Sequence, residues 1–400
     1  MKGALELRIL VLAPQPFFTD RGTPIAVRLL LETLAERGHQ LDVLVFAEGE
    51  DVVIPGCTFT RVPSIPGTRH MSPGFSVKKA VCDAALTLIA AGKLARRRYD
   101  VIHAVEEAAF IAMALGPIFR VPYVYDMDSS IPEQISDKFR IPAWVRSGLI
   151  TAERMAVRGS VGAITCCRAL EDIIHRHAPD LPVQTLEDVT LIDTRVGEEP
   201  PADCRFEEPL AMYVGNLEPY QGVGLLIDGF AEAAGAATKW RLVIIGGTEA
   251  HIAEHRDRAA ERGVEERVTF LGPRPVQQLG LYLRQATLVV SPRMQGLNTP
   301  MKVYSYLDSG RPLLATRLPT HTQVLDDEIA MLVDPTPQGM AAGLTRLFTD
   351  DHLRRRLSEA ARARVADRFS RKAFIRKLLG FYEGRIVPRL KREQLHGKVA

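Results

Sequence analysis

Short apolar runs alternate with longer segments of helical periodicity along most of the chain. The runs are rich in Val, Ile and Leu and contain few polar residues, which is typical of strands buried on both faces of a parallel sheet. The first series of expected strands comprises Arg8–Ala13, Gln40–Phe46, Val101–Ala104, Tyr123–Asp126 and Gly162–Thr165. The second series comprises Leu210–Val214, Trp240–Ile245, Val268–Leu271, Leu288–Ser291, Pro312–Thr316 and Ala330–Val333.

These two series of strands predict two domains of the same class. Strands that alternate with amphipathic helices form βαβ units, so we expect an α/β fold with two Rossmann-like, doubly wound domains facing across a cleft. The polar, proline-bearing segment Asp193–Pro209 separates the series. It places an N-terminal domain at residues 1–195 and a C-terminal domain at residues 205–370. Residues 371–400 are expected to form a basic helix and tail that returns onto the N-terminal domain.

The composition is that of an ordinary globular protein and excludes several other classes. Of the 400 residues, 46% are hydrophobic, 25% charged and 6% aromatic, which rules out wholesale disorder, a collagen-like repeat and a disulfide-dense scaffold. The net charge of +3 gives no sign of a dedicated nucleic-acid binder. The five cysteines are odd in number and lack a CxxC pair, so we expect reduced thiols and no cysteine-based metal site.

The predicted location is the cytosol. Glu6, Arg8 and Pro14 interrupt the apolar run at the N-terminus, which argues against a signal peptide, and no segment has a transmembrane pattern. Two segments leave contact with an anionic membrane surface open. In Asp351–Ala400, 15 Lys and Arg residues stand against 5 Asp and Glu residues, and Ser76–Arg98 reads as an apolar helix with basic ends. A solvated helix face and an ordinary buried helix are the alternative interpretations.

The segment Val290–Gly310 carries the most specific chemical signal. It leaves a predicted strand, turns through a glycine and is expected to begin a helix at Pro300. Free amides at that helix start, together with the positive charges of Arg293 and Lys302, fit a diphosphate group. The segment Tyr213–Gly224 adds a weaker signal, a strand followed by a glycine-rich turn that lets phosphate or sugar approach the backbone.

Capping residues predict where two helices near these loops begin. Asn298 or Thr299 is expected to cap the helix that starts within the segment just described. In the first loop of the chain, Thr23 is expected to be the N-cap and Pro24 the first helical residue. Gly22 beside them permits close approach to the backbone, so this helix start suits a sugar hydroxyl or an anion.

Polar side chains also follow two strands of the first series. An Asp-x-Asp sequence after an apolar strand can hold a divalent cation that bridges a diphosphate, or it can belong to a hydrogen-bonding cluster without a metal. A serine after it can instead cap a helix. The side chains concerned are His103, Glu106, Glu107, Asp126, Asp128, Ser129 and Ser130.

Several of these segments resemble the retaining GT-B glycosyltransferases of family 4. The resemblance implies the GT-B fold, a nucleotide-sugar donor in the C-terminal domain and an acceptor in the N-terminal domain. It implies neither a cofactor nor a requirement for a divalent metal. The matching segments are Arg21–Pro24, Gly215–Gly222, Val268–Gly272, Val290–Pro292, Asn298–Pro312, which has the Asn-Thr-Pro-x-Lys-x-Tyr pattern of one branch, and Pro319–Asp327.

Some positions differ from the pattern of this family. Asn216 and Gln221 stand where many relatives carry Arg and Lys for the diphosphate, so charge leaves that group to Arg293 and Lys302. Asp128 stands where relatives carry a His near the scissile bond.

The resemblance and the local chemistry together give three groups of expected site residues. Ser305, at a position where relatives carry a glutamate, is retained among the donor contacts. The catalytic group is Asp128, Arg293 and Lys302. The donor-binding group is Gly215, Asn216, Gln221, Gly246, Gly272, Arg274, Asn298, Thr299, Pro300 and Ser305. The acceptor-binding group is Gly22, Thr23, His103, Glu106 and Ser129.

The reaction implied by the resemblance is transfer of a hexose from a nucleotide sugar with retention of configuration. Fixed cations and amides would stabilise the leaving diphosphate, and no enzyme nucleophile is needed if the leaving phosphate takes the proton of the acceptor. The expected acceptor is a sugar, and a lipid-linked or surface-polysaccharide precursor is one form that it can take. Two alternatives remain: a nucleotide-sugar epimerase of the same fold that uses Glu106, Glu107 and Asp128, and a non-catalytic nucleotide-sugar binding subunit.

Overall fold

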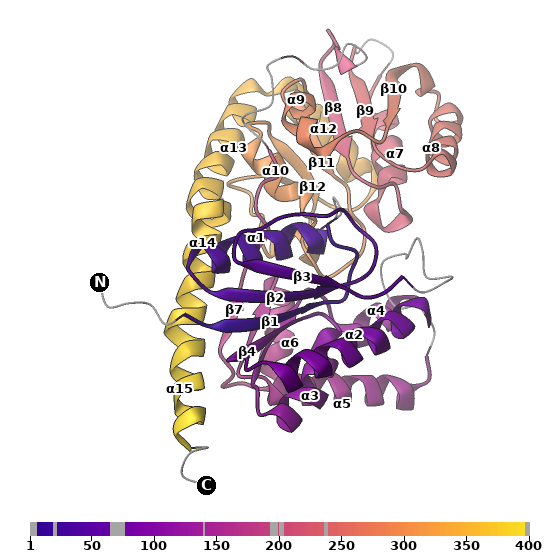
Figure 1. The fold of residues 1–400 in the computed structure, drawn as a ribbon. Coiled ribbons are helices and arrows are strands. Elements are labelled where there is room, and N and C mark those ends of the chain that lie inside the picture. Colours follow the sequence, from indigo (N-terminus) through magenta and orange to yellow (C-terminus); the bar gives the residue numbers. More distant parts are fainter. Residues whose placement is uncertain are drawn as a thin grey trace. The chain divides into compact units, whose positions relative to one another are not determined.

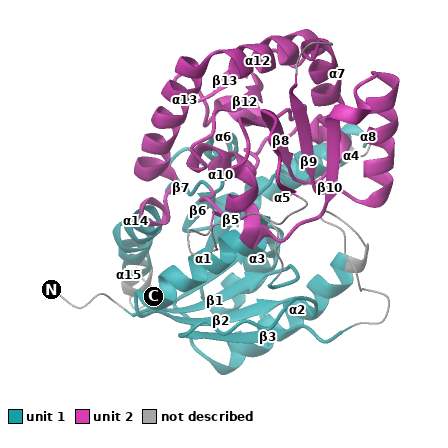
Figure 2. Ribbon diagram, turned by 90° about the horizontal axis from the view of Figure 1, so that it is seen from above, with its two compact units in different colours: residues 1–187, 375–400 teal, residues 188–374 magenta. Residues whose placement is uncertain are grey.

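A computed structural model of the chain describes residues 6–18, 22–64, 77–138, 141–192, 199, 204–235 and 239–396. The chain divides into two compact units, coloured separately in Figure 2. Residues 1–187 and 375–400 form the N-terminal unit, and residues 188–374 form the C-terminal unit. Arg21 of the matched segment Arg21–Pro24 lies outside the described residues, as do residues 193–198 and 200–203 of the predicted domain boundary.

The N-terminal unit is built on a seven-stranded parallel sheet with the order β3-β2-β1-β4-β5-β6-β7. The central strands are buried on both faces, as their apolar sequences predict. Two edge strands, β3 and β7, were not expected from the sequence. The bounds are β1 Arg8–Ala13, β2 Gln40–Val45, β3 Cys57–Arg61, β4 Val101–Val105, β5 Tyr123–Met127, β6 Gly162–Thr165 and β7 Val183–Thr185.

Helices cover both faces of this sheet (Figure 1), which is why consecutive strand residues are buried. Neighbouring helices α2, α3 and α5 pack in sequence on one face, where their apolar side chains join those of the strands in one core. The helices are α1 Gly22–Glu36, α2 Val77–Arg96, α3 Ala108–Phe119, α4 Ile131–Lys138, α5 Ala143–Gly159, α6 Arg168–His177 and α15 Val387–His396. Helix α14, Arg371–Phe381, spans the boundary between the two units.

The C-terminal segment of the chain completes the N-terminal unit. Its buried residues Phe381 and Ile386 lie against β6, where a Cβ on Gly162 would come within 2.6 Å of the Ile386 Cδ1. Lys377 forms an ion pair with Glu187 in the same unit. Because a side chain at position 162 would collide with this segment, glycine is what lets the last helices approach the sheet. Among the described helices, none combines the length and apolar character needed to span a bilayer.

The C-terminal unit contains a six-stranded parallel sheet with the order β10-β9-β8-β11-β12-β13. Every strand expected in the second series is present, and no strand end differs from its expected position by more than one residue. The strands are β8 Leu210–Val214, β9 Arg241–Ile245, β10 Val268–Gly272, β11 Leu288–Ser291, β12 Leu313–Thr316 and β13 Met331–Val333. The helices are α7 Val223–Ala233, α8 Glu249–Glu261, α9 Leu279–Leu283, α10 Lys302–Asp308, α11 Pro319–Thr322, α12 Pro337–Thr349 and α13 Asp351–Arg364.

Both sheets have the doubly wound order of a Rossmann fold, so the predicted fold class is confirmed. In each sheet the first strand is central and the chain winds outward from it in both directions. The strand order therefore reverses between β1 and β4 in one unit and between β8 and β11 in the other. Ligands of this fold class bind beyond the carboxyl ends of the strands at such a reversal.

The predicted helix starts differ from the observed ones. Helix α1 begins at Gly22, so Thr23 lies in its first turn and is not the N-cap. Helix α10 begins at Lys302, its N-cap position is Met301, and no side chain caps it. The expectation that Asn298 or Thr299 caps this helix is therefore wrong. The physical reason is that the chain first makes a tight turn in which the amide of Val303 donates to the carbonyl of Pro300.

Candidate active site

The loops at the strand reversal of the C-terminal unit pack through their backbones. The amide of Gly246, after β9, donates to the carbonyl of Gly272 at the end of β10. The amide of Gly215, after β8, donates to the carbonyl of Ile245. Gly246 has φ +111°, and a Cβ there would lie 2.1 Å from the carbonyl oxygen of Gly215. Only glycine fits, so three of the predicted donor-binding glycines form one continuous surface of backbone.

Lys302 extends from the first position of α10 to the end of β8. Its Nζ donates to the hydroxyl oxygen of Tyr213 over 2.7 Å and to the Oε1 of Gln221 over 3.0 Å. A Cβ on Gly215 would come within 2.6 Å of the same Nζ, so this lysine also depends on a glycine. The structure thus brings together Lys302, Gln221 and Gly215 from the predicted set and adds Tyr213, which was expected only as part of a strand.

Arg293 lies on the loop that leaves β11, beside the same turn. Its guanidinium carbon is 5.2 Å from the centre of the Tyr220 ring, and its Nε donates to the carbonyl of Gln295 over 2.7 Å. The amide of Met294 donates to the carbonyl of Tyr220 over 2.8 Å, which ties the two loops together. Asn216 reaches the Tyr220 hydroxyl through its side-chain amide, 3.3 Å away, so this predicted residue borders the same place.

Neither cation has a negatively charged partner in the part of the chain that the structure describes. Among the described residues, no carboxylate lies within ion-pair distance of Arg293 or Lys302, and the only cation that shifts the pKa of Lys302 is Arg293. Burial, followed by repulsion from Arg293, lowers the pKa of Lys302 well below its usual value. Burial also lowers the pKa of Arg293. Two largely enclosed positive charges that repel each other favour the binding of an anion between them.

A buried polar network holds the Arg293 loop in place. The hydroxyl of Thr316, at the end of β12, donates to the carbonyl of Arg293 over 2.5 Å. His321 lies behind it, with its Nδ1 2.9 Å from the carbonyl of Thr316 and its Nε2 2.8 Å from the Ser291 hydroxyl. A carbonyl can only accept, so the proton of His321 sits on Nδ1 and the Ser291 hydroxyl donates to Nε2. Burial lowers the pKa of His321 to about 4, which keeps the ring neutral.

Side chains of α11 and the following residue continue this support. The hydroxyl of Thr320 donates to the carbonyl of Asn298 over 2.6 Å, and the side-chain amide of Gln323 donates to the carbonyl of Leu297 over 2.7 Å. The segment Pro319–Asp327 was noted in the sequence only as part of a family resemblance. In the structure, hydrogen bonds from this segment hold the loop that carries Arg293 in place.

The remaining predicted donor residues have varied surroundings. Thr299 is buried, and within the described part of the chain its hydroxyl has no hydrogen-bond partner. Pro300 is buried beside it. Ser305 is completely buried, and its hydroxyl accepts a hydrogen bond from the amide of Leu191 over 2.9 Å. Arg274 lies on the loop after β10, where it contacts the carbonyl of Pro273. Their predicted contacts with a donor remain predictions.

A second polar network lies in the N-terminal unit at the ends of β4 and β5. His103 is completely buried, with its Nε2 3.0 Å from the Oδ2 of Asp126 and its Nδ1 2.7 Å from the hydroxyl of Tyr382. A carboxylate accepts, so the proton lies on Nε2 and Tyr382 donates to Nδ1. Tyr382 belongs to the C-terminal segment, and no sequence pattern predicts a contact between residues so far apart.

Several carboxylates gather next to this network around one lysine. Lys79 on α2 lies 2.6 Å from Glu107 and 3.9 Å from Glu106. The hydroxyl of Ser129 is 3.5 Å from Glu106, which itself has φ +50°. Burial, reinforced by the charge of Glu107, raises the pKa of Glu106 to about 7. Burial likewise raises the pKa of Asp83 on α2 to about 7.

The structure therefore joins three of the predicted acceptor residues, His103, Glu106 and Ser129, in one place. Gly22 and Thr23 lie on α1, and within the described residues no hydrogen bond or ion pair links them to that place. Asp128 follows β5, where its carbonyl oxygen is 3.5 Å from the sulfur of Cys166. Within the described residues, His, Cys, Asp and Glu side chains nowhere gather in threes in a way that could hold a metal ion.

Comparison with known proteins agrees with this architecture. Solved structures with the same fold include sucrose-phosphate synthase from Thermosynechococcus elongatus, with a TM-score of 0.75 and 18% identity over 97% of this chain and 100% of that one. HepE from Anabaena, solved in complex with UDP, has a TM-score of 0.71 and 17% identity over 96% of this chain and 100% of that one. At these identities the likeness shows the fold, which is GT-B.

Sequence comparison identifies the family. The model described as "Glycosyl transferase 4-like domain" matches residues 21–185, and the model described as "Glycosyl transferases group 1" matches residues 208–350. The chain belongs to the GT-B glycosyltransferases. A D-inositol 3-phosphate glycosyltransferase from Acidothermus cellulolyticus is 25% identical over 92% of this chain and 86% of its own length. The protein of that name from Corynebacterium glutamicum is 33% identical, over a segment that spans 37% of each chain.

Proposed function

We propose that this protein transfers a hexose from a nucleotide-sugar donor to a hydroxyl-bearing acceptor with retention of configuration. The observation that carries the proposal is the pair Arg293 and Lys302, two enclosed cations with no carboxylate partner among the described residues. A nucleoside diphosphate supplies the missing negative charge. HepE, which has the same fold, was solved with UDP and with UDP-glucose, and this supports a uridine nucleotide as the first donor to test.

The chemistry that follows from these contacts is stabilisation of the leaving group. Negative charge grows on the diphosphate as the glycosidic bond breaks, and fixed cations in an enclosed site lower the energy of that state. Tyr213 and Gln221 hold the Nζ of Lys302 by two hydrogen bonds, so little reorganisation is needed when the charge develops. Because these two cations neutralise negative charge on the diphosphate, we propose that the reaction requires no divalent metal.

We further propose that the acceptor binds to the N-terminal unit beside the network of His103, Asp126 and Glu106. Carboxylates and hydroxyls near one lysine are suited to hold several hydroxyl groups of a sugar or cyclitol. The leaving phosphate would take the proton of the attacking hydroxyl, and Asp128 would hold a hydroxyl of the transferred sugar. The relatives named D-inositol 3-phosphate glycosyltransferase support an acceptor of this chemical class.

Three exposed apolar side chains of the N-terminal unit support an acceptor that is linked to a lipid. Leu88 on α2 and Trp144 on α5 are 75% and 78% exposed, and Ile118 on the intervening helix α3 is 70% exposed. Large apolar side chains on neighbouring helices are a feature of surfaces that bind membranes or partners. We propose that these side chains contact an anionic membrane. Flotation with vesicles that contain anionic lipid tests it, and loss of flotation in Leu88→Ser with Trp144→Ser is the expected result.

A panel of radiolabelled nucleotide sugars, offered with sugar and cyclitol acceptors and in the presence of EDTA, tests the proposed activity. Transfer to an acceptor, or slow hydrolysis of the donor, is expected. Recovery of an epimerised donor would instead favour the epimerase. Tight binding of a nucleotide sugar without any turnover would favour a non-catalytic binding subunit. The anomeric configuration of the product, measured by NMR coupling constants, decides whether the configuration is retained.

A further inference from the structure

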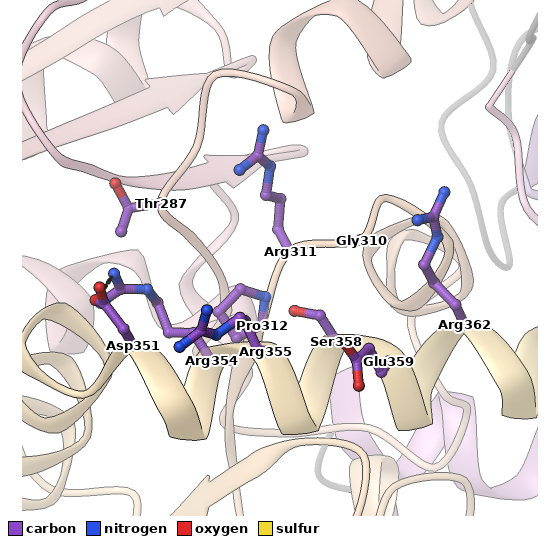
Figure 3. A pocket seen from close by; sticks show the side chains of 10 residues that line it. All are labelled: Thr287, Gly310, Arg311, Pro312, Asp351, Arg354, Arg355, Ser358, Glu359 and Arg362. Atoms are coloured by element: carbon purple, nitrogen blue, oxygen red, sulfur yellow. Dashed lines mark hydrogen bonds and ion pairs between the residues drawn. The ribbon is translucent and has the colours of Figure 1, made fainter.

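A cavity of about 350 Å³ lies at the opposite edge of the C-terminal sheet from Arg293 and Lys302. Thr287 directly precedes β11 and Pro312 directly precedes β12, so both mark the amino ends of the strands. One face of α13 forms the other wall (Figure 3). Because a parallel sheet presents its donor site at the carboxyl ends, this cavity is separated from the proposed donor site by the length of the strands.

The cavity is unusually rich in arginine. The lining residues with charged side chains are Arg311, Arg354, Arg355, Arg362, Asp351 and Glu359. Asp351 is already paired with Arg354, as the dashed line in Figure 3 shows. The excess positive charge therefore rests on the other arginines, against a single further carboxylate at Glu359.

Two of the arginines have structural roles. Arg354 donates to the carbonyls of Leu347 and Phe348 over 2.7 and 3.0 Å, which caps the end of α12. Arg311 donates to the carbonyl of Arg284 at the end of α9, and burial lowers the pKa of Arg311. These contacts fix the two side chains in the cavity wall, where their charges remain uncompensated or only partly compensated.

The other two arginines are available to a ligand. The guanidinium groups of Arg355 and Arg362 form neither a hydrogen bond nor an ion pair with the residues that the structure describes. They lie on the same face of α13 as Ser358, at the spacing that places side chains one or two turns apart. Gly310 has φ +74°, and a Cβ there would lie 3.5 Å from the guanidinium carbon of Arg362. The turn before β12 therefore leaves room beside this guanidinium.

We propose that this cavity binds a phosphate-bearing small molecule. The planar guanidinium group presents paired donors that match phosphate oxygens, and several arginines around one cavity are the usual means of holding a phosphate. Ser358, which is buried, adds a hydroxyl donor at the wall. The volume is about tenfold that of a water molecule, ~30 Å³, so the cavity accommodates a phosphate together with an organic group such as a sugar. This site is independent of the proposed donor site.

The test uses the full chain with Arg293→Ala and Lys302→Ala, which disables the other candidate anion site. Isothermal titration calorimetry at 0.15 M salt measures binding of inorganic pyrophosphate and of glucose 1-phosphate, with sulfate as the non-phosphate anion. We expect at least one of the two phosphate probes to bind, and more tightly than sulfate. Stronger binding of glucose 1-phosphate identifies a sugar phosphate as the preferred ligand class, and stronger binding of pyrophosphate identifies a free polyphosphate.

Adding Arg355→Ala and Arg362→Ala to that background is expected to weaken binding at least tenfold. The matched control is Arg356→Ala, an exposed arginine of the same helix that does not line the cavity. It is expected to change affinity by less than twofold. Binding that survives removal of both arginines overturns the proposal, as does an equal loss in the Arg356 variant, or no binding of either phosphate probe. Circular dichroism melting of each variant shows that the fold is retained.

Discussion

The Nζ of Lys302 and the hydroxyl oxygen of Tyr213 lie 2.7 Å apart, and this contact joins the first residue of α10 to the end of β8. The lysine donates, so the tyrosine hydroxyl uses its own proton elsewhere, in a 2.6 Å hydrogen bond to the carbonyl of Asn216. A charged amine is thus held in place by neutral oxygens alone. Binding of an anion stabilises such a buried charged amine strongly, because the anion reverses the effect of burial on the pKa of the amine.

Removing either cation should weaken both donor binding and turnover. For Lys302→Ala and Arg293→Ala, we expect a loss of more than tenfold in turnover and a higher KM for the donor, because each variant removes one charge that faces the diphosphate. Steady-state kinetics with the best donor of the panel measures both constants. Lys239→Ala, an exposed lysine of the same unit, serves as the control. Near-normal rates for both variants would exclude these residues from the diphosphate site.

The Tyr213 hydroxyl is expected to act by positioning Lys302. Tyr213→Phe removes one of the two acceptors of the Nζ and keeps the aromatic ring beside it. Loss of one hydrogen bond costs about 1 kcal/mol, so we expect donor affinity to fall about fivefold. The lysine also becomes easier to deprotonate, so the loss should grow as the pH rises from 7 to 9.

A comparison with Tyr306→Phe separates positioning from general damage to the core. The Tyr306 hydroxyl is buried and bonds to the backbone of Val214, without contacting Lys302. Both variants are expected to lose stability, but only Tyr213→Phe should make donor binding more sensitive to pH. Parallel pH profiles of the Kd in the two variants would contradict a positioning role.

Glu106 should make the stability of the protein depend on pH. Its folded pKa of about 7 lies above the ordinary value of 4.5, so the native state favours the protonated acid. Its contribution to stability is present below pH 4.5 and is lost as the pH rises through 7. Glu106→Gln mimics the protonated form. We expect its free energy of unfolding to equal that of the parent at pH 4.5 and to exceed it at pH 8.5, by on the order of 3 kcal/mol.

Urea unfolding of the two proteins at both pH values measures this difference. Glu50→Gln removes an exposed carboxylate of the same unit and is expected to leave the pH dependence unchanged. A Glu106→Gln variant that differs from the parent equally at pH 4.5 and pH 8.5 would show that this carboxyl is not the titrating group.

The strands show which parts of the fold the sequence can predict. All strands of the C-terminal sheet were expected, because a strand with helices on both sides is apolar throughout. The strands β3 and β7 were missed because β3 alternates polar residues and β7 has only three residues. An edge position alone does not hide a strand, since β10 and β13 also lie at the edges of their sheet and were expected.

The candidate site was predictable only where residues lie near strand ends. Gly215, Gln221 and Lys302 gather because loops at the carboxyl edge of a parallel sheet converge, which is a rule of topology. The contacts of Tyr213 with Lys302 and of Tyr382 with His103 join residues 89 and 279 positions apart. A tyrosine in an apolar segment gives no sign of its partner, since packing decides where its hydroxyl lies. The predicted start of α10 was wrong because Thr299 is a favoured capping residue, and capping preferences do not take account of the turn at Pro300.

Tyr382 is expected to stabilise the N-terminal unit through His103. In Tyr382→Phe, the Nδ1 of His103 loses its donor and stays buried, which costs roughly 1–3 kcal/mol. Chemical unfolding of Tyr382→Phe, His103→Gln and the double variant measures the coupling between the two residues. We expect the double variant to be more stable than the sum of the single effects predicts. If the losses in the free energy of unfolding are additive, the hydrogen bond between Tyr382 and His103 contributes nothing to stability.

His321 is expected to make the C-terminal unit sensitive to acid. Its folded pKa of about 4 lies below the ordinary value of 6.5, so the unfolded chain binds a proton first as the pH falls. Stability is therefore complete above pH 6.5 and declines toward pH 4, by at most roughly 3 kcal/mol. The main physical cause is burial, which disfavours the charged ring. A proton on Nε2 would also displace the hydrogen bond that this nitrogen accepts from Ser291. The Arg293 loop depends on that network through Thr316.

Tryptophan fluorescence can report this loss in one unit alone. Trp144→Phe leaves Trp240, which stacks on Phe348 in the C-terminal unit, as the single tryptophan of the chain. In this background, urea unfolding between pH 7.5 and pH 4.5 should show a steep loss of stability in the parent and a shallower one in His321→Gln, which has no titrating ring. His352→Gln, at an exposed position on α13, is the control. Equal slopes for His321→Gln and the parent would mean that another group senses the acid, because a side chain that cannot take up a proton cannot contribute to the pH dependence.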